Sequence, residues 1–354
     1  MAINYAEKYG SKVAELFSHA SFVKMHTNGK LDFTGNKTLK IYMVNTVPVG
    51  KYTRSGMSRY GEVTDVQDTV MEYTMTQDLA FTGVVDKGDA KDQTIDNKVG
   101  AFLNAQNKQQ IVPNADKYAL RKFANFGHVE PLAAAPAKDT VCGMFAKARE
   151  WFTDHLVPED GRIAYVASDV YTMIAQSDEF IKLEKLGEKS VSRGEVGMLF
   201  GFHIIEIPKS YLPAGCYFLC MAKNATCMPY KIEKVNTHID PPGISGVLIE
   251  GRYYFDAFVF GEKADAVYAA VDTSKALTMS IGGTNSATTL TCSGAALIKY
   301  TLDGSDPRFS DSAQVYSTAV NVGAGKTIRA VGFPAQNYET DPGKFTSAVA
   351  EKTW

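Results

Sequence analysis

The sequence lacks the features that mark secreted, membrane-spanning and nucleic-acid-binding proteins. Its first residues, MAINYAEKYGSK, contain neither the basic nor the apolar segment of a secretory signal. No run approaches the roughly 18 apolar residues of a membrane helix. The net charge is −2, without the cluster of Lys and Arg that binding to duplex DNA needs. We therefore expect a chain that stays in a soluble compartment, away from membranes.

The cysteines follow neither a disulfide pattern nor a metal-binding pattern. There are five of them: Cys142, Cys216, Cys220, Cys227 and Cys292. An odd number in a large chain argues against a disulfide framework, so we expect reduced thiols. The gaps between Cys216, Cys220 and Cys227 match no zinc motif, and no histidine lies close to them in the sequence. We expect these three to be small buried hydrophobic residues and expect no metal site.

Catalytic motifs are missing as well. The six histidines are dispersed, and there is no HExxH, GxSxG, Walker A or dinucleotide-binding sequence. The carboxylate pairs Glu159-Asp160 and Asp178-Glu179 are expected in exposed turns, where solvation explains them without catalysis. The turn from Asp303 to Asp306 could offer oxygens to calcium, but a tight turn is the simpler explanation. We expect no enzymatic activity and no cofactor.

The sequence does contain a regular strand pattern between residues 71 and 85. Met71, Tyr73 and Met75 alternate with polar residues, and the run continues to Val85. A period of two is typical of a half-buried strand. An acidic turn, Asp86-Lys87-Gly88-Asp89, separates this strand from the segment that follows.

That next segment has the spacing of an amphipathic helix. Its apolar residues recur at positions i, i+4, i+7 and i+8: Ile95, Val99, Phe102 and Leu103. Asp89 is the predicted N-cap, because its carboxylate can accept from amides of the first turn. We expect a proline-containing break in this helix at Ile111-Val112-Pro113.

The segment before the strand predicts an arm followed by a long hairpin. Residues 1–38 combine a short amphipathic helix (Tyr5, Val13, Phe17) with a polar tail, and residues 39–49 form an apolar, strand-like run. One limb of the hairpin carries three cations and the return limb carries carboxylates: Lys51, Arg54 and Arg59 against Asp65 and Asp68. These charges either pair within the hairpin or face a neighbouring subunit, and the sequence leaves both possibilities open.

The middle of the chain predicts a mixed α/β unit. Residues 127–137 are predicted to be a connector, and a helix starts near Thr140 and stops before Pro158. Further predicted elements, in chain order, are a strand at 162–167, a helix at 168–175, strands at 197–207, 216–222, 230–234 and 246–260, and a helix at 262–271.

The composition changes after Asp272, where Thr, Ser, Gly and Ala become frequent. Short apolar runs with turn signals between them predict a small β-sandwich, with strands near 277–281, 288–292, 297–302, 319–322 and 327–332. The run IKYTLDGSDP (298–307), with KTIRAV (326–331) downstream, resembles the immunoglobulin-like module at the carboxyl ends of chitobiases. The resemblance implies an immunoglobulin-like domain. Tyr316, Phe333 and Tyr338 could stack on a sugar, although core packing is the better-supported role.

The run VVDKGDAKDQTIDNKVGAFLNAQNKQQIVPNADKYAL (84–120), preceded by YTRSGMSRYG (52–61), resembles the major capsid proteins of tailed phages. The resemblance implies an α+β Hong Kong 97-like capsid fold, in which an extended hairpin called the E-loop precedes a long spine helix. The implied parts are an N-terminal arm (1–38), the E-loop with its flanking strands (39–85), a peripheral domain (86–137 and 240–272), an axial domain (138–239) and the immunoglobulin-like C-terminal domain (273–354).

The same resemblance implies a structural protein made in the host cytoplasm and located in the virion. It would self-assemble into pentamers and hexamers of an icosahedral capsid around double-stranded DNA, contacting that DNA weakly and non-specifically. A scaffolding protein, a portal and decoration proteins would be partners. The expected contacts between subunits are Lys51, Arg54, Arg59, Asp65, Asp68, Asp86, Lys87 and Asp89. Two alternatives stay open, an encapsulin-like nanocompartment shell and a carbohydrate-binding surface protein.

Overall fold

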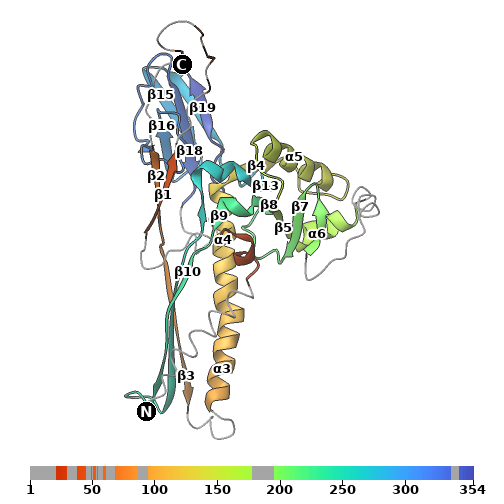
Figure 1. The fold of residues 1–354 in the computed structure, drawn as a ribbon, viewed down its shortest axis with the longest axis vertical. Helices are drawn as coiled ribbons and strands as arrows, with labels where there is room; N and C mark the ends of the chain where they lie inside the picture. The colour runs from red at the N-terminus through yellow and green to blue at the C-terminus, as the bar shows by residue number, and fades with distance from the viewer. Residues whose placement is uncertain are drawn as a thin grey trace.

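The computed structural model describes residues 21–29, 38–44, 49, 51–52, 54, 59–60, 68–86, 95–177, 195–335 and 343–354. The predicted helix around Tyr5, Val13 and Phe17 and the predicted N-cap Asp89 lie outside these ranges. Figure 1 shows a long helix beside a long sheet, with a mixed α/β part to one side. The C-terminal strands lie at the top of the view, above the long sheet. Within the described ranges, no helix is long and apolar enough to cross a membrane.

The spine is formed by α3 (Ile95–Gln106), a π turn (Asn107–Ile111) and α4 (Val112–Phe126). These follow one another as one column in Figure 1, so the predicted break at Pro113 is wrong. A proline inside a helix lacks an N–H and crowds the carbonyl four residues earlier. Here the Val112 N–H bonds to the Asn107 carbonyl, five residues back, and this wider turn allows the helix to continue.

A three-stranded antiparallel sheet packs against α3. Its order is β10 (Tyr230–Ile239), β11 (Gly246–Phe255) and β3 (Gln77–Asp86). Along β3 the side chains alternate between half-buried and exposed from residue 77 to residue 85, which confirms the predicted pattern. The apolar cluster between this sheet and α3 contains Phe81, Val85, Phe102, Leu103, Val235, Val247 and Ile249.

The predicted hairpin is present as β1 (Thr38–Val44) and β2 (Asp68–Thr74), which pair antiparallel from Thr38 opposite Thr74 to Val44 opposite Asp68. Among the described strands, β1 and β2 pair only with each other. Two-stranded hairpins are marginally stable alone. The direction of this hairpin therefore depends on side-chain contacts at its root, where β2 leads into β3.

The mixed α/β part is a six-stranded sheet covered by α5 (Val141–Asp154) and α6 (Ser168–Ala175). The strand order is β4 (His128–Leu132), β13 (Val267–Asp272), β8 (Cys216–Ala222), β5 (Arg162–Ala167), β7 (Phe202–Ile207) and β6 (Glu195–Leu199). Short elements complete it: the 3-10 turns η1 (Lys24–His26), η3 (Lys223–Ala225) and η4 (Gly261–Ala266), and the pair β9 (Thr226–Cys227) and β12 (Phe258–Val259). The predictions for β5, β8 and α6 are confirmed.

Three predictions for this part are wrong. The expected connector at 127–137 contains β4, whose position at the sheet edge tolerates Pro131. The expected helix at 262–271 is η4 followed by β13, because the run VYAAV is fully buried between β4 and β8. The expected strand at 197–207 is two strands, β6 and β7, joined at Phe200-Gly201.

The C-terminal strands form two sheets around a common core. One sheet pairs β14 (Met279–Thr284) with β15 (Ala287–Cys292). The other has the order β17 (Gln314–Val315), β16 (Leu297–Thr301), β18 (Thr327–Phe333) and β19 (Ala350–Thr353). The core contains Leu290, Tyr300, Val322, Ile328 and Ala330. The predicted strand at 319–322 is reduced to a single bridge between Thr288 and Val320.

Two glycine substitutions test the packing of this fold. A methyl group at Gly251 in β11 would overlap the Phe81 ring, whereas one at Gly143 in α5 would meet no atom within 4 Å. We expect Gly251→Ala to lower the free energy of unfolding by about 1–3 kcal/mol. We expect Gly143→Ala to raise it by about 0.5–1 kcal/mol, because alanine favours a helix over glycine. Urea denaturation measures both, and equal effects would contradict the packing described.

Candidate functional site

A buried carboxylate lies at the root of the β1–β2 hairpin. Asp256 follows β11 and has no exposed surface. Its Oδ2 accepts hydrogen bonds from the Thr76 amide (2.8 Å) and hydroxyl (2.9 Å). Its Oδ1 accepts from Tyr118 OH (2.9 Å), Lys122 Nζ (2.6 Å) and the Ala257 amide (2.7 Å). We call Asp256, Thr76, Tyr118 and Lys122 the Asp256 junction; it joins the start of β3, helix α4 and the end of β11.

The charges in the Asp256 junction compensate each other inside an apolar setting. The Lys122 side chain is 13% exposed, and its Nζ lies 5.2 Å from the Phe258 ring centroid and 5.4 Å from the Tyr118 ring centroid. Aromatic faces stabilise a cation at such distances. A buried ion pair is tolerated only when hydrogen bonds satisfy both partners, and removing one partner is costly. The stability of the Asp256 junction therefore depends on the presence of both Asp256 and Lys122.

Aromatic contacts fix β2 beside the junction. Tyr73 of β2 accepts a hydrogen bond from the Gly261 amide (3.1 Å), and its ring lies edge-on to Phe258 (5.4 Å) and Phe260 (5.8 Å). The Tyr254 hydroxyl donates to the Met75 carbonyl (2.6 Å). These contacts orient the hairpin on one side of its root.

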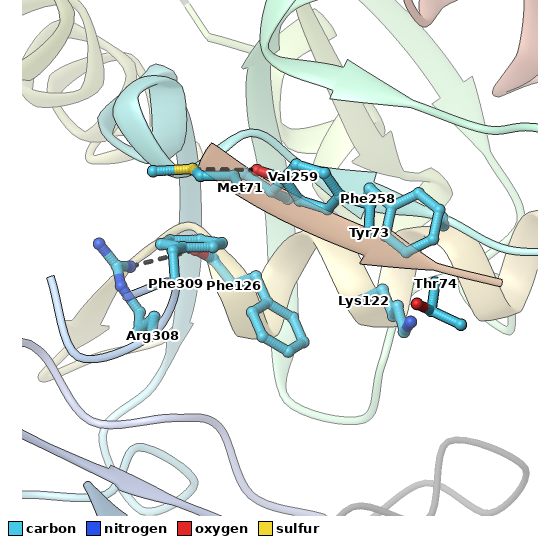
Figure 2. Close-up of a pocket in the computed structure, with 10 residues that line it drawn as sticks. Met71, Tyr73, Thr74, Lys122, Phe126, Phe258, Val259, Arg308 and Phe309 are labelled. Atoms are coloured by element: carbon cyan, nitrogen blue, oxygen red, sulfur yellow. Dashed lines mark hydrogen bonds between the residues drawn. The ribbon is translucent and has the colours of Figure 1, made fainter. Parts of the chain in front are cut away.

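A cavity of about 210 Å³ lies at the root, and Tyr73, Lys122 and Phe258 also line it. Figure 2 shows Met71 and Tyr73 from β2, Lys122 and Phe126 from α4, and Arg308 and Phe309 from the C-terminal part around it. Thr74, Ala257, Phe258 and Val259 complete the lining. Four parts of the chain that are distant in sequence thus meet at this point.

A second buried carboxylate attaches the N-terminal segment to α4. Asp116 has no exposed surface and accepts from Ser21 Oγ (2.5 Å) and the Phe22 amide (2.9 Å). The Tyr165 hydroxyl donates to the Phe22 carbonyl (3.2 Å). Burial raises the pKa of Asp116 to about 6, although the hydrogen bonds from Ser21, Phe22 and Val23 oppose that shift. We therefore expect the docking of residues 21–29 to depend on pH.

The predicted contact residues are only partly within the described ranges. Lys51, Arg54 and Arg59 are exposed, and the rings of Tyr52 and Tyr60 beside them meet edge-on at 5.1 Å. Two of the predicted acidic contacts have a place in the strands, since Asp68 opens β2 and Asp86 ends β3. The remaining three, Asp65, Lys87 and Asp89, lie outside the described residues.

Sequence reasoning missed the Asp256 junction. A signal for it exists, because Asp256 interrupts the apolar run YYFDAFVF (253–260). An acidic residue in such a run requires buried donors. Apart from the adjacent Ala257 amide, its partners lie 134 to 180 residues away, so no local pattern identifies them.

The cysteines are packed as the sequence predicts. Cys216 and Cys220 are buried in β8, and burial raises the pKa of the Cys216 thiol to about 12. Burial likewise raises the pKa of Cys227 to about 12. Thiols with such pKa values stay protonated at neutral pH, and the thiolate is the metal ligand and nucleophile. In the described part of the chain, no group of three or more His, Cys, Asp or Glu residues could hold a metal ion.

Replacing Lys122 tests the Asp256 junction. Lys122→Met keeps the length of the side chain but leaves a buried carboxylate without its cation, so we expect a loss of about 3 kcal/mol in the free energy of unfolding. The matched control is Lys209→Met, which removes the Lys209–Asp169 pair (2.6 Å), whose side chains are 77% and 42% exposed. We expect this control to leave the free energy of unfolding nearly unchanged, because solvent screens an exposed pair. Similar losses in the two variants would contradict a special role for the junction.

We expect the buried Asp116 carboxyl to make the free energy of unfolding depend on pH. Its pKa in the folded chain is raised above that of the unfolded chain, so its contribution to stability is present at low pH and is lost as the pH rises through about 6. Between pH 5 and pH 7.5 we expect the free energy of unfolding to fall by about 1 kcal/mol more in the wild type than in Asp116→Asn. Urea denaturation at both pH values measures this difference. Parallel pH profiles would show that Asp116 titrates normally.

Comparison with known proteins identifies both parts of the fold. The family model described as chitobiase/beta-hexosaminidase C-terminal domain matches residues 280–343. Comparison with curated protein sequences finds no match.

Solved structures match most of the chain at low identity. The capsid of cyanophage P-SCSP1u aligns with a TM-score of 0.55 and 12% identity, covering 72% of this chain and 88% of that one. A chain of Mycobacterium phage Che8 aligns with a TM-score of 0.51 and 16% identity, covering 69% and 89%. The virus-like particle from Pyrococcus furiosus aligns with a TM-score of 0.50 and 10% identity, covering 76% and 100%. The chain therefore has the Hong Kong 97-like capsid fold, followed by a C-terminal β-sandwich of the immunoglobulin-like kind.

Proposed function

We propose that this chain is the major capsid protein of a tailed phage, a structural protein without enzymatic activity. Its copies would form pentamers and hexamers of an icosahedral shell around double-stranded DNA, and the protein would reside in the virion after synthesis in the host cytoplasm. The observation that carries the proposal is the match to capsid chains along most of their own length, 88% and 89% for the two phage structures.

The long hairpin supports a role in self-association. Strands β1 and β2 pair only with each other among the described strands, and the neighbouring limb exposes Lys51, Arg54 and Arg59. We propose that these cations contact acidic groups of a second copy, with Asp65, Asp68, Asp86, Lys87 and Asp89 in the same interface. Such contacts join different surfaces of identical chains, and they close into rings when the rotation between copies permits it.

The division of the chain is part of the proposal. Residues 1–38 would be the arm, 39–85 the E-loop, 86–137 with 240–272 the peripheral domain, 138–239 the axial domain and 273–354 a surface-exposed C-terminal domain. A scaffolding protein, a portal and decoration proteins are proposed partners. The near-neutral chain, with a net charge of −2, fits weak and non-specific contact with packaged DNA.

A nanocompartment shell is the second candidate, and the match to the virus-like particle from Pyrococcus furiosus favours keeping it. Such a shell would enclose protein cargo rather than DNA. Glycan binding by the C-terminal sandwich has less support, because Phe333 is 3% exposed and Tyr316 packs against the core. The third ring considered for stacking, Tyr338, lies outside the described residues.

Assembly of the purified protein tests the proposal. We expect size-exclusion chromatography with light scattering to find species far above the 38.6 kDa of one chain, and negative-stain microscopy to show shells or ring-like capsomers. The variant Lys51→Glu/Arg54→Glu/Arg59→Glu should remain smaller while its melting temperature stays unchanged. The charge-matched control Lys138→Glu/Lys223→Glu/Lys326→Glu, at exposed positions elsewhere, should assemble. A wild-type monomer, even at high salt and with crowding agent, would contradict the proposal.

A further inference from the structure

The C-terminal β-sandwich contacts the root of the hairpin through the loop that follows Asp306. We propose that Arg308 and Phe309 of this loop set the direction of the β1–β2 hairpin, so that the C-terminal part acts as an internal support for it. This role is a property of the single chain and can be measured before any assembly occurs.

Arg308 fixes the loop to the carboxyl end of the spine helix. Its guanidinium is almost buried (side chain 6% exposed) and donates to the carbonyls of Phe126 (3.1 Å) and Gly127 (2.7 Å). Phe126 is the last residue of α4, and Gly127 is its C-cap. The last carbonyls of a helix have no partner within the helix and carry a partial negative charge. Arg308 donates to the Phe126 carbonyl from a segment 182 residues further along the chain. The Asp306 carboxylate accepts from Arg308 Nη2 (2.6 Å) and neutralises the guanidinium charge.

Phe309 packs against the end of the spine helix and lines the cavity that β2 also lines. Its ring centroid lies 6.0 Å from that of Phe126, and the two rings are tilted by 47°. A methyl group added to Gly261 would lie 2.9 Å from Met71 Cε in β2 and 2.9 Å from Phe309 Cβ. Figure 2 shows Phe309 between Arg308 and Phe126, on the same side of the cavity as Met71. At Gly261 the hairpin strand, η4 and the C-terminal loop thus leave no room for a methyl group.

A second attachment keeps the C-terminal part from moving as a separate body. Phe345 is 1% exposed and belongs to the main core cluster of the six-stranded sheet and α4. The amide of Thr346 donates to Asn125 Oδ1 in the last turn of α4 (3.2 Å). Two segments of the C-terminal part therefore hold the same end of α4, and Phe309 is presented to β2 from a fixed position.

The hairpin needs further support at its root. Tyr73 and the Asp256 junction hold the root, but the cavity of about 210 Å³ that β2, α4 and the C-terminal loop line together leaves the space between them incompletely filled. On this proposal, removing the Phe309 ring would enlarge the cavity that it shares with Met71 and Tyr73, and β2 would tilt more freely. When a side chain that lines a cavity is removed, the neighbouring elements move partly into the space that is left.

Hydrogen exchange of the unassembled chain tests the proposal. In Phe309→Ala we expect amides in 38–44 and 68–76 to exchange roughly threefold faster or more, with no change in 216–222 or 327–333. The matched control is Val315→Ala in the same sandwich, where the side chain is 57% exposed; it should leave the hairpin unchanged. Gly261→Ala keeps the Phe309 ring but crowds both Met71 and Phe309 Cβ, and it should accelerate exchange in 68–76.

Two results would overturn the proposal. One is wild-type exchange in 38–44 and 68–76 in both Phe309→Ala and Gly261→Ala. The other is an equal increase in 216–222 and 327–333, which would mean general destabilisation rather than loss of a local support. Because the measurement uses unassembled protein, its outcome is independent of whether the chain forms shells.

Discussion

The fold depends on one buried carboxylate, Asp256, which accepts five hydrogen bonds, four of them from segments that are distant in sequence. Its burial would be prohibitive without these donors, since an unpaired charge inside a protein costs several kcal/mol. The requirement to satisfy it places the start of β3 and helix α4 at the end of β11. The long sheet, the spine helix and the hairpin acquire their relative positions from this requirement.

Helix α4 makes the contacts that attach the other parts of the chain to one another. Near its start, Asp116 holds the N-terminal segment through Ser21 and Phe22. In its middle, Tyr118 and Lys122 reach Asp256. At its end, the carbonyls of Phe126 and Gly127 accept hydrogen bonds from Arg308. A helix of 15 residues therefore joins the arm, the hairpin root and the C-terminal sandwich. Its hydrophobic side packs on the six-stranded sheet and leaves these polar groups for the junctions.

The sequence predicted the elements whose local pattern agrees with their surroundings. Strands β5 and β8, helix α6 and the alternating strand β3 are of this kind. The prediction failed at β13, because a run of Val, Tyr and Ala fits a helix locally and becomes a strand only between β4 and β8. It failed at Pro113 because a π turn absorbs the proline.

The candidate site was harder to predict for a related reason. Asp256 is conspicuous in an apolar run, yet Thr76, Tyr118 and Lys122 carry no local signal that they are its donors. Arg308 and Phe309 likewise gain their roles only from contact with the end of α4. The charged residues of the hairpin limb are visible in the sequence, but no local pattern tells pairing within the hairpin from the proposed contact with a second copy.

A reconstruction by electron cryo-microscopy of the assembly formed by the full-length protein tests the central claim most directly. The account predicts a closed shell in which the hairpin limb of one copy, including Lys51, Arg54 and Arg59, lies on another copy. Within each copy the Asp256 junction should be intact. A hairpin folded back onto its own copy, or an open filament in place of a shell, would contradict the account.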